Sequence, residues 1–183
     1  MELENFLRFL NTLALRHDPY ENDHSENIAI LARGLAEAAN YPMAKFDSLI
    51  LSAQLHDVGK LLIPEKVLNK HGRLTVEEIA QIHRHVEIGY DAVSALGLDP
   101  IVSQVILEHH ECWDGTGYPH GLKSQNISLE ARMIAVCDAF EALTSNRAYR
   151  LALTPANAIQ IMQSGSNYDP ELLDIFIKKV VRL

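Results

Sequence analysis

The chain has 183 residues, a length that suits one domain with a sizeable core. Its 48% hydrophobic and 22% charged residues are normal for a soluble globular protein, and no apolar run is long enough for a transmembrane helix. The formal net charge of −8 argues against binding of nucleic acid polymers, which a basic surface would favour.

Helix signals dominate the sequence and strand alternation is nearly absent, so the predicted fold class is all-α. A first helix is predicted over about 3–16, and the Asp18-Pro19 step ends it. Asp23 is the expected N-cap of a second helix that reaches about Ala39. The apolar stripe of this helix consists of Ile28, Leu31 and Leu35, and one turn back from Ile28 it places His24 on the core-facing side.

A third helix is predicted from about Met43 to Asp57. Its buried stripe ends in His56 and Asp57, so both polar side chains are expected to face the core. Gly59 is the residue expected to stop this helix.

Thr75 and Glu78 have the spacing of a capping box and predict the start of the next helix. The chain is expected to bend or restart within 83–87. Beyond that point His85 and Gly89 share one face, and Gly89 is small enough to let another helix come close.

Pro100 suits the first turn of a helix that leads to His109, with His110 beside it. Thr154 and Asp169, each followed by proline, predict the starts of the two last helices.

Between these helices, Ser128 is the expected cap of a long helix that reaches about Tyr149. Asp138 and Glu141 lie three residues apart on it, and hence on one face.

Several helices thus place a potential metal ligand at one end of an apolar stripe. The candidates are His24, His56, Asp57, His85, His109, His110 and Asp138. A lone histidine on an apolar face is usually an ordinary core residue, but seven such polar groups packed together without a cation would be costly. Five imidazoles and two carboxylates exceed the needs of one ion, so two ions sharing a bridging carboxylate fit better. Two ions about 3.5–4 Å apart suit phosphodiester hydrolysis.

Three motifs carry a resemblance to one family. HDVGK (56–60) is followed by HHECWDGTGYP (109–119) and CDAFEALTSNRAYR (137–150). A His-Asp pair alone occurs by chance, but the three motifs together closely resemble the HD-GYP family of the metal-dependent HD phosphohydrolases. The resemblance covers roughly residues 18–150.

This resemblance implies an all-α HD-domain helical bundle with the metal site in its core, and a single HD-GYP domain over 1–183 in which 151–183 form C-terminal helices. It implies a bimetallic phosphodiesterase that hydrolyses cyclic di-GMP to pGpG, with further cleavage to GMP left open. The implied cofactors are two divalent ions, iron or manganese, with nickel or zinc as alternatives. A water or hydroxide that bridges the ions is the expected nucleophile.

Carried over by position, the resemblance divides the ligands between the ions. One ion would take His24, His56, Asp57 and Asp138. The other would take Asp57 as a bridge, with His85, His109 and His110. Asp57 and Lys60 are the implied catalytic residues, and Lys60 would also contact a substrate phosphate.

The resemblance also implies substrate contacts. Tyr118 would pack near a guanine, and Arg147 would pair with phosphate or base. Glu141 stands where many members have aspartate, and it reaches further toward a base than aspartate would. Arg150 offers another positive contact. The family's third-ion glutamate position is Tyr20 here, so two ions are expected.

Two alternative functions stay open at this point. One is hydrolysis of 3′,3′-cyclic GMP-AMP, on which relatives of the family also act. The other is a non-catalytic module that binds a nucleotide or, through the Gly-Tyr-Pro loop, a diguanylate cyclase domain.

The remaining histidines match no metal position. His17, His71, His83 and His120 are therefore expected on the surface. Cys112 and Cys137 are too few for a disulfide framework. The N-terminus lacks the features of a signal peptide, so the expected location is the cytoplasm.

Overall fold

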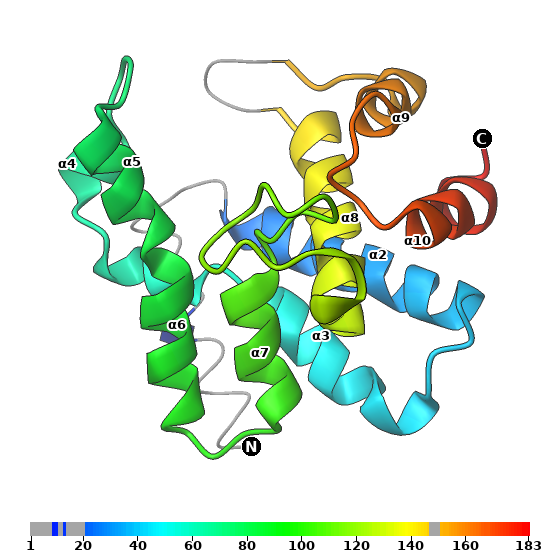
Figure 1. The fold of residues 1–183 in the computed structure, drawn as a ribbon, viewed down its shortest axis with the longest axis horizontal. Helices are drawn as coiled ribbons and strands as arrows, with labels where there is room; N and C mark the ends of the chain where they lie inside the picture. Colours follow the sequence, from blue (N-terminus) through cyan, green and yellow to red (C-terminus); the bar gives the residue numbers. More distant parts are fainter. Residues whose placement is uncertain (1–8, 11–12, 14–20, 147–150) are drawn as a thin grey trace.

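The computed structural model describes residues 9–10, 13, 21–146 and 151–183, and within these ranges the regular elements are all helical, as predicted (Figure 1). Most of the helix predicted over 3–16 lies outside the described residues. No helix in the described ranges is long and apolar enough to cross a membrane.

The elements follow one another with short connections. In chain order they are α2 (Glu21–Ala38), η1 (Met43–Lys45), α3 (Phe46–Leu55), η2 (Val58–Leu62), α4 (Glu65–Leu68), α5 (Val76–His83), α6 (His85–Ser94), α7 (Pro100–Glu108), η3 (Ser124–Asn126), α8 (Leu129–Thr144), α9 (Pro155–Gln163), α10 (Pro170–Ile175) and η4 (Phe176–Val181).

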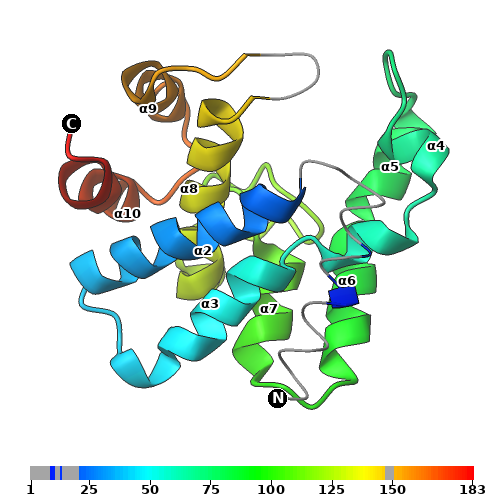
Figure 2. The same cartoon turned by 180° about the vertical axis from the view of Figure 1, so that it is seen from behind.

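The larger core lies where α2 packs against α3, α8 and the C-terminal helices, an arrangement seen from behind in Figure 2. Ile28 and Leu35 of the predicted α2 stripe are completely buried there, with Ile134 of α8 and Phe176 of η4. The outward-facing Ile30 is 64% exposed, so the 3.6-residue period correctly identified the inner face of α2.

A smaller core joins α3, α6 and α7 through Leu55, Val93, Val102 and Ile106. Gly89 permits this packing, because a Cβ atom there would lie 2.8 Å from a methyl carbon of Ile106.

The expected role of Gly59 as a helix stop is wrong. Helix α3 already ends at Leu55, and Gly59 lies inside the 3₁₀ turn η2. A Cβ atom on Gly59 would lie 1.9 Å from the carbonyl oxygen of His85. Glycine is therefore required for the close approach of η2 to the start of α6, which brings Asp57 and His85 together.

The predicted caps of three helices are confirmed. Thr75 and Glu78 form the capping box of α5, with the Thr75 amide donating to Glu78 Oε2 at 2.8 Å. Thr154 caps α9 and Asp169 caps α10 through their side-chain oxygens. Ser128 occupies the N-cap position of α8, but its side chain forms no cap; instead its backbone amide donates to buried Glu108.

Two predicted helix boundaries are wrong. Helix α2 begins at Glu21, so Asp23 lies inside its first turn rather than at its cap. Helix α8 ends at Thr144 rather than near 149, because Ser145 turns to extended backbone and the Asn146 side chain accepts from the amide of Ala152. These local side-chain bonds compete with helix continuation.

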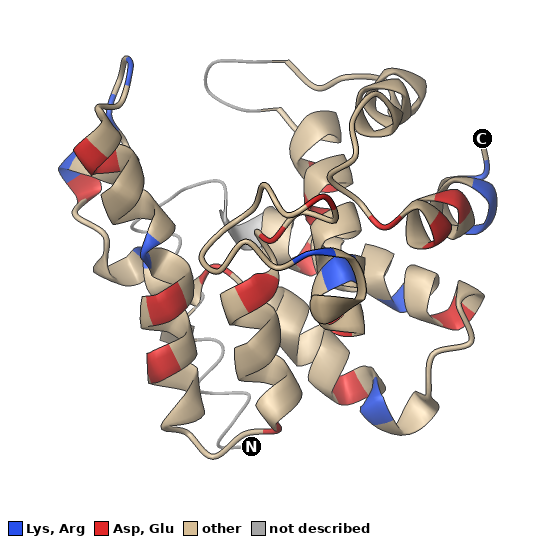
Figure 3. Cartoon of the chain, in the orientation of Figure 1, with Lys and Arg blue, Asp and Glu red and all other residues tan. Residues whose placement is uncertain are grey.

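The charged residues are distributed over many elements. In the view of Figure 3, lysine and arginine positions occur on α2, just before α3, on the α4–α5 arm, around the start of α8 and at the C-terminal end, with acidic positions between them. The basic positions are thus spread over several elements of the described chain rather than gathered on one of them.

Candidate metal centre

The predicted ligands meet around the carboxylate of Asp57, which directly follows the end of α3. Its Oδ1 atom lies 3.2 Å from Nε2 of His85 at the start of α6 and 3.8 Å from Nε2 of His109 at the end of α7. Its Oδ2 atom lies 3.1 Å from Nε2 of His56. Asp57, His56, His85 and His109 are all at least 92% buried.

The structure gathers these donors into two groups that share Asp57. One consists of Asp57, His85, His109 and His110; the other consists of His24, His56 and Asp57. Asp138 adjoins the second group, with its Oδ1 atom 3.2 Å from Nε2 of His24. We refer to His85, His109 and His110 as the imidazole side, and to His24, His56 and Asp138 as the carboxylate side.

Backbone carbonyl groups orient three of the histidine rings in the same way. Nδ1 of His56 donates to the carbonyl of Ala53 at 2.8 Å, and His85 and His109 each donate to the carbonyl three residues earlier, at 2.7 and 2.9 Å. A carbonyl can only accept, so each Nδ1 carries a proton and Nε2 is the ring atom left to bind an ion.

Four of the ligand atoms that face the centre lack a hydrogen-bond partner. Nε2 of His56, His85 and His109 and Oδ1 of Asp57 are buried without such a partner among the described residues. Buried lone pairs that converge without donors are costly in a protein alone and suit a cation. Imidazole and carboxylate donors fit a first-row divalent ion, so the residues present match the implied cofactor.

His24, on the carboxylate side, is held differently, by acidic side chains. Nδ1 of His24 bonds to Oε2 of Glu141, and Nε2 of His24 faces Asp138. Glu141 is 4% exposed and also accepts from Ser145 Oγ at 2.6 Å and from Asn27 Nδ2 at 3.3 Å. Both of its oxygens are thus engaged within the protein.

The pKa values differ between the two sides. Burial alone would lower the pKa of His24, but its bonds to Asp138 and Glu141 raise that pKa to about 10. Burial lowers the pKa of His109 and, together with the nearby His109, lowers the pKa of His110 well below the usual range. In the metal-free protein His24 therefore holds a proton, whereas the rings of His109 and His110 are neutral.

Lys60 supplies a positive charge beside the shared carboxylate. Its Nζ atom bonds to Oδ2 of Asp57, and its side chain is 24% exposed. Burial would raise the pKa of Asp57, but Lys60 and His56 hold it well below the usual range. Asp57 is therefore ionised, and Lys60 lies between it and solvent.

Glu111, for which no sequence motif predicts a role, holds the loop after α7 together. Glu111 is 3% exposed, and its two carboxylate oxygens accept from the amides of His120 and Leu122 at 2.7 and 2.9 Å. A Cβ atom on Gly117 would lie 2.3 Å from the amide nitrogen of Cys112, so the loop folds tightly back on the ligand segment. No periodicity marks such a contact in the sequence.

The surface prediction for the other histidines is only partly correct. His71 and His120 are exposed, as expected, and His17 lies outside the described residues. His83 is half-buried and stacks on Tyr118, so its surface prediction is wrong. Arg147 and Arg150 lie outside the described residues, and their substrate contacts stay predictions.

A small pocket opens beside the ligands. Its volume is about 120 Å³, and His110 and Asp138 line it together with Asn167 and Tyr168 from the segment before α10. The sequence motifs did not indicate this C-terminal contribution. The segment is joined to the loop, because the Trp113 amide donates to the Asn167 carbonyl at 2.8 Å.

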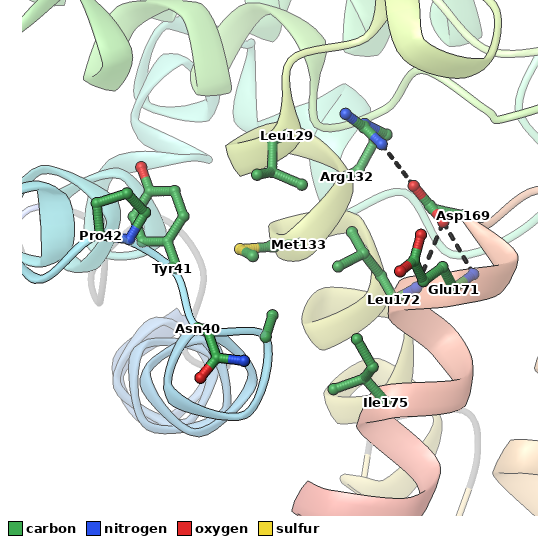
Figure 4. A pocket seen from close by; sticks show the side chains of 11 residues that line it. Asn40, Tyr41, Pro42, Leu129, Arg132, Met133, Asp169, Glu171, Leu172 and Ile175 are labelled. Carbon is green, nitrogen blue, oxygen red and sulfur yellow. Dashed lines mark hydrogen bonds and ion pairs between the residues drawn. The ribbon is translucent and has the colours of Figure 1, made fainter.

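A larger pocket, of about 220 Å³, lies away from the ligands between the end of α2, α8 and α10 (Figure 4). Arg132 points toward Asp169 at its rim, and the two form an ion pair at 2.5 Å. None of the predicted ligands lines this pocket. Of these two pockets, the one beside His110 adjoins the metal centre.

A helical bundle that buries convergent histidines and aspartates at its helix ends has the architecture of the HD-type metal-dependent phosphohydrolases. A family model described as HD domain matches residues 8–172 of the chain. The chain belongs to this HD domain family and, by its motifs and relatives, to the HD-GYP branch.

Similar proteins include a cyclic di-GMP phosphodiesterase of Pseudomonas aeruginosa, 38% identical over 89% of this chain and 40% of its own length. A cyclic di-GMP phosphodiesterase of Thermotoga maritima is 34% identical over 97% of this chain and 50% of its own length. A 3′3′-cGAMP-specific phosphodiesterase of Vibrio cholerae is 31% identical over 85% of this chain and 30% of its own length. The chain thus spans half or less of each of these relatives.

The fold is also found in solved structures. An HD-GYP-related protein of Bdellovibrio bacteriovorus superposes with a TM-score of 0.71, at 20% sequence identity, over 93% of this chain and 58% of the other. At this identity the likeness shows the fold alone.

Proposed function

We propose that the chain is a phosphodiesterase that uses two divalent ions to hydrolyse cyclic di-GMP to pGpG, and pGpG on to GMP. The observation that carries the proposal is the buried Asp57 carboxylate, which faces lone pairs from two separate donor groups. The cyclic di-GMP phosphodiesterases among the relatives supply the substrate class.

The predicted ligands would be divided between the two ions. His24, His56 and Asp138 would hold one ion, His85, His109 and His110 the other, and Asp57 both. Ions held there supply an activated water and neutralise charge at the phosphorus centre.

Lys60 and Tyr118 are the described candidates for substrate contact. The Lys60 ammonium is partly exposed beside Asp57, which suits a contact to a substrate phosphate. The Tyr118 ring already stacks on His83 and His110, so its edge and hydroxyl are what it would offer a nucleotide. Glu141 is committed to His24, which favours a role in holding that ring rather than a base contact.

The deciding experiment is anaerobic purification, metal analysis and product identification with cyclic di-GMP. We expect two ions per chain and release of pGpG and then GMP, with Asp57→Ala losing both ions and turnover. Metal-loaded protein that leaves cyclic di-GMP intact, and behaves like Asp57→Ala, would contradict the proposal.

A second candidate substrate is 3′,3′-cyclic GMP-AMP. The 3′3′-cGAMP-specific relative and the glutamate at position 141 favour testing it. Turnover of both dinucleotides by wild type and Glu141→Asp separates the two substrates. A changed substrate preference in the variant would show that Glu141 takes part in base choice. A change in metal content alone would show that Glu141 acts by holding the His24 ring.

A non-catalytic role, with binding of a diguanylate cyclase domain through the Gly-Tyr-Pro loop, is the remaining alternative. The complete donor set speaks against it, because binding alone does not require orphaned lone pairs. Nucleotide binding without turnover in iron-replete, reducing buffer would favour it. The cytoplasmic location and the extent of the domain over 1–183 stay predictions.

A further inference from the structure

Three aromatic rings form a stack that ends on one of the predicted ligands. The rings of His83 and Tyr118 are nearly parallel, with centroids 3.7 Å apart and planes 7° apart. The rings of Tyr118 and His110 also stack, with centroids 4.9 Å apart and planes 29° apart. A ring at 3.7 Å fills one face of Tyr118, so His110 occupies the opposite face.

His110 differs from the other histidine ligands in what orients it. Backbone carbonyls fix the rings of His56, His85 and His109, and Glu141 fixes that of His24. Among the described residues, no hydrogen bond to the His110 ring performs this task. The neighbours of that ring are aromatic: Tyr118, His109 at 4.1 Å and His85 at 5.1 Å between centroids.

The helix break at Arg84 makes the stack possible. Helix α5 ends at His83 and α6 begins at His85, with Arg84 between them. His85 points to Asp57, while His83 lies against Tyr118.

The loop holds Tyr118 in place from the other direction. Its amide donates to the carbonyl of His110 at 3.2 Å, and Gly117 allows the close approach to Cys112. Backbone and ring thus both tie Tyr118 to His110, and His83 closes the outer face.

We propose that His83 and Tyr118 are positioning residues that aim the His110 imidazole at the ion on the imidazole side. The stack replaces the hydrogen bond that orients each of the other ligands, and second-layer groups of this kind change metal affinity roughly 10–100-fold. His83 then acts as a flat surface rather than as a charge. This inference rests on the two-ion centre of the proposed function.

The test is titration of the metal-free full chain with Mn²⁺, followed by ion count and by the electron paramagnetic resonance signal of a coupled Mn²⁺ pair. We expect His83→Ala to weaken one of two ions roughly 10–100-fold and to lose the pair signal at limiting Mn²⁺. His83→Phe keeps a flat ring and is expected to retain both. The matched control is His71→Ala, an exposed histidine.

Variants at Tyr118 separate the contribution of its ring from that of its hydroxyl. Tyr118→Leu removes the ring and is expected to resemble His83→Ala, whereas Tyr118→Phe keeps the ring and should bind both ions as wild type does. Circular dichroism and thermal midpoints establish that each variant is folded.

The outcomes separate this inference from the function on which it rests. Wild type binding two ions, with His83→Ala binding both at unchanged affinity, overturns the positioning role and leaves the function standing. Loss of the ion in His83→Phe as well as in His83→Ala also overturns it, because a flat ring would then not suffice. Wild type that binds fewer than two ions overturns both.

Discussion

The two sides of the metal centre share Asp57 but differ in how their buried polar groups are paired. On the imidazole side, Nε2 of His85 and of His109 is buried without a hydrogen-bond partner among the described residues, and the lowered pKa values of His109 and His110 keep those two rings neutral. On the carboxylate side, His24 satisfies Asp138 and Glu141 with its own proton. A cation therefore meets prepared lone pairs on one side and has to displace a proton on the other.

The origin of the two sides in the chain differs as well. The imidazole side comes from α6, α7 and the residues that follow them, which are close in sequence. The carboxylate side joins α2 to α8, and His24 and Glu141 are 117 positions apart. The first side depends on local helix ends, whereas the second depends on the packing of the larger core.

Replacement of the shared carboxylate is expected to have the largest effect. Asp57→Asn removes the charge that faces both sides, so both ions should be lost and turnover should fall on the order of 10³-fold or more, because bound ions supply several kcal/mol of charge stabilisation. Metal analysis measures the loss of ions, and turnover of cyclic di-GMP measures the loss of activity. The matched control is Asp91→Asn, at an exposed position on α6. A variant that keeps one ion would show that the sides are independent.

A more selective change removes the charge of Glu141. Glu141→Gln is expected to weaken the ion on the carboxylate side roughly 10–100-fold and to leave the imidazole side unchanged, because Glu141 contacts His24. Mn²⁺ titration of the variant tests this, with the exposed Glu37→Gln on α2 as the control. Equal weakening of both ions would break the distinction between the sides.

The third prediction concerns pH. In the metal-free protein His24, with a pKa of about 10, keeps its proton at neutral pH, so an ion on the carboxylate side releases it. The affinity of that ion should rise about tenfold per pH unit for each proton released. His109 and His110 are neutral in this range and add little pH dependence. Calorimetry in buffers of different ionisation enthalpy counts the protons, and equal release from both ions would contradict the prediction.

The same pKa shifts fix the sign of the stability change in the metal-free protein. The raised pKa of His24 gives a contribution that is complete below about pH 6.5 and is lost as the pH rises toward 10. The lowered pKa values of His109 and His110 have the opposite effect on stability. Folding disfavours the protonation of these rings, so the folded state loses stability as the pH falls below the usual pKa range of histidine. Thermal midpoints of wild type and His24→Gln between pH 6.5 and 9 isolate the first contribution.

The sequence predicts the features of this protein that depend on neighbours within one helical turn. The capping box at Thr75 and the stripe ending in His56 and Asp57 are such features, and the structure bears them out. The apolar stripes indicated the seven candidate ligands, whereas their division into two donor groups was implied by the resemblance to the HD-GYP family.

What the sequence could not provide depends on contacts between distant segments. The stack of His83 on Tyr118 requires both the helix break at Arg84 and the tight loop at Gly117. The sequence around one of these features does not indicate that the other lies next to it. The bond from His24 to Glu141 depends on how α2 crosses α8. Glycine at 59 was assigned to a helix end because spacing cannot show the approach of the His85 carbonyl.

The smallest expected effect lies in the loop that borders the imidazole side. Glu111→Gln leaves one acceptor oxygen for two amides, so one partly buried N–H loses its partner at a cost of about 0.5–1.5 kcal/mol. For a chain of this size the thermal midpoint should fall about 2–4 °C for each kcal/mol. Mn²⁺ affinity should fall slightly, and only on the imidazole side, because Tyr118 belongs to the same loop. The control is Glu37→Gln. If the thermal midpoint of Glu111→Gln were no lower than that of this control, the hydrogen bond from Trp113 to Asn167 would be enough to hold the loop in place.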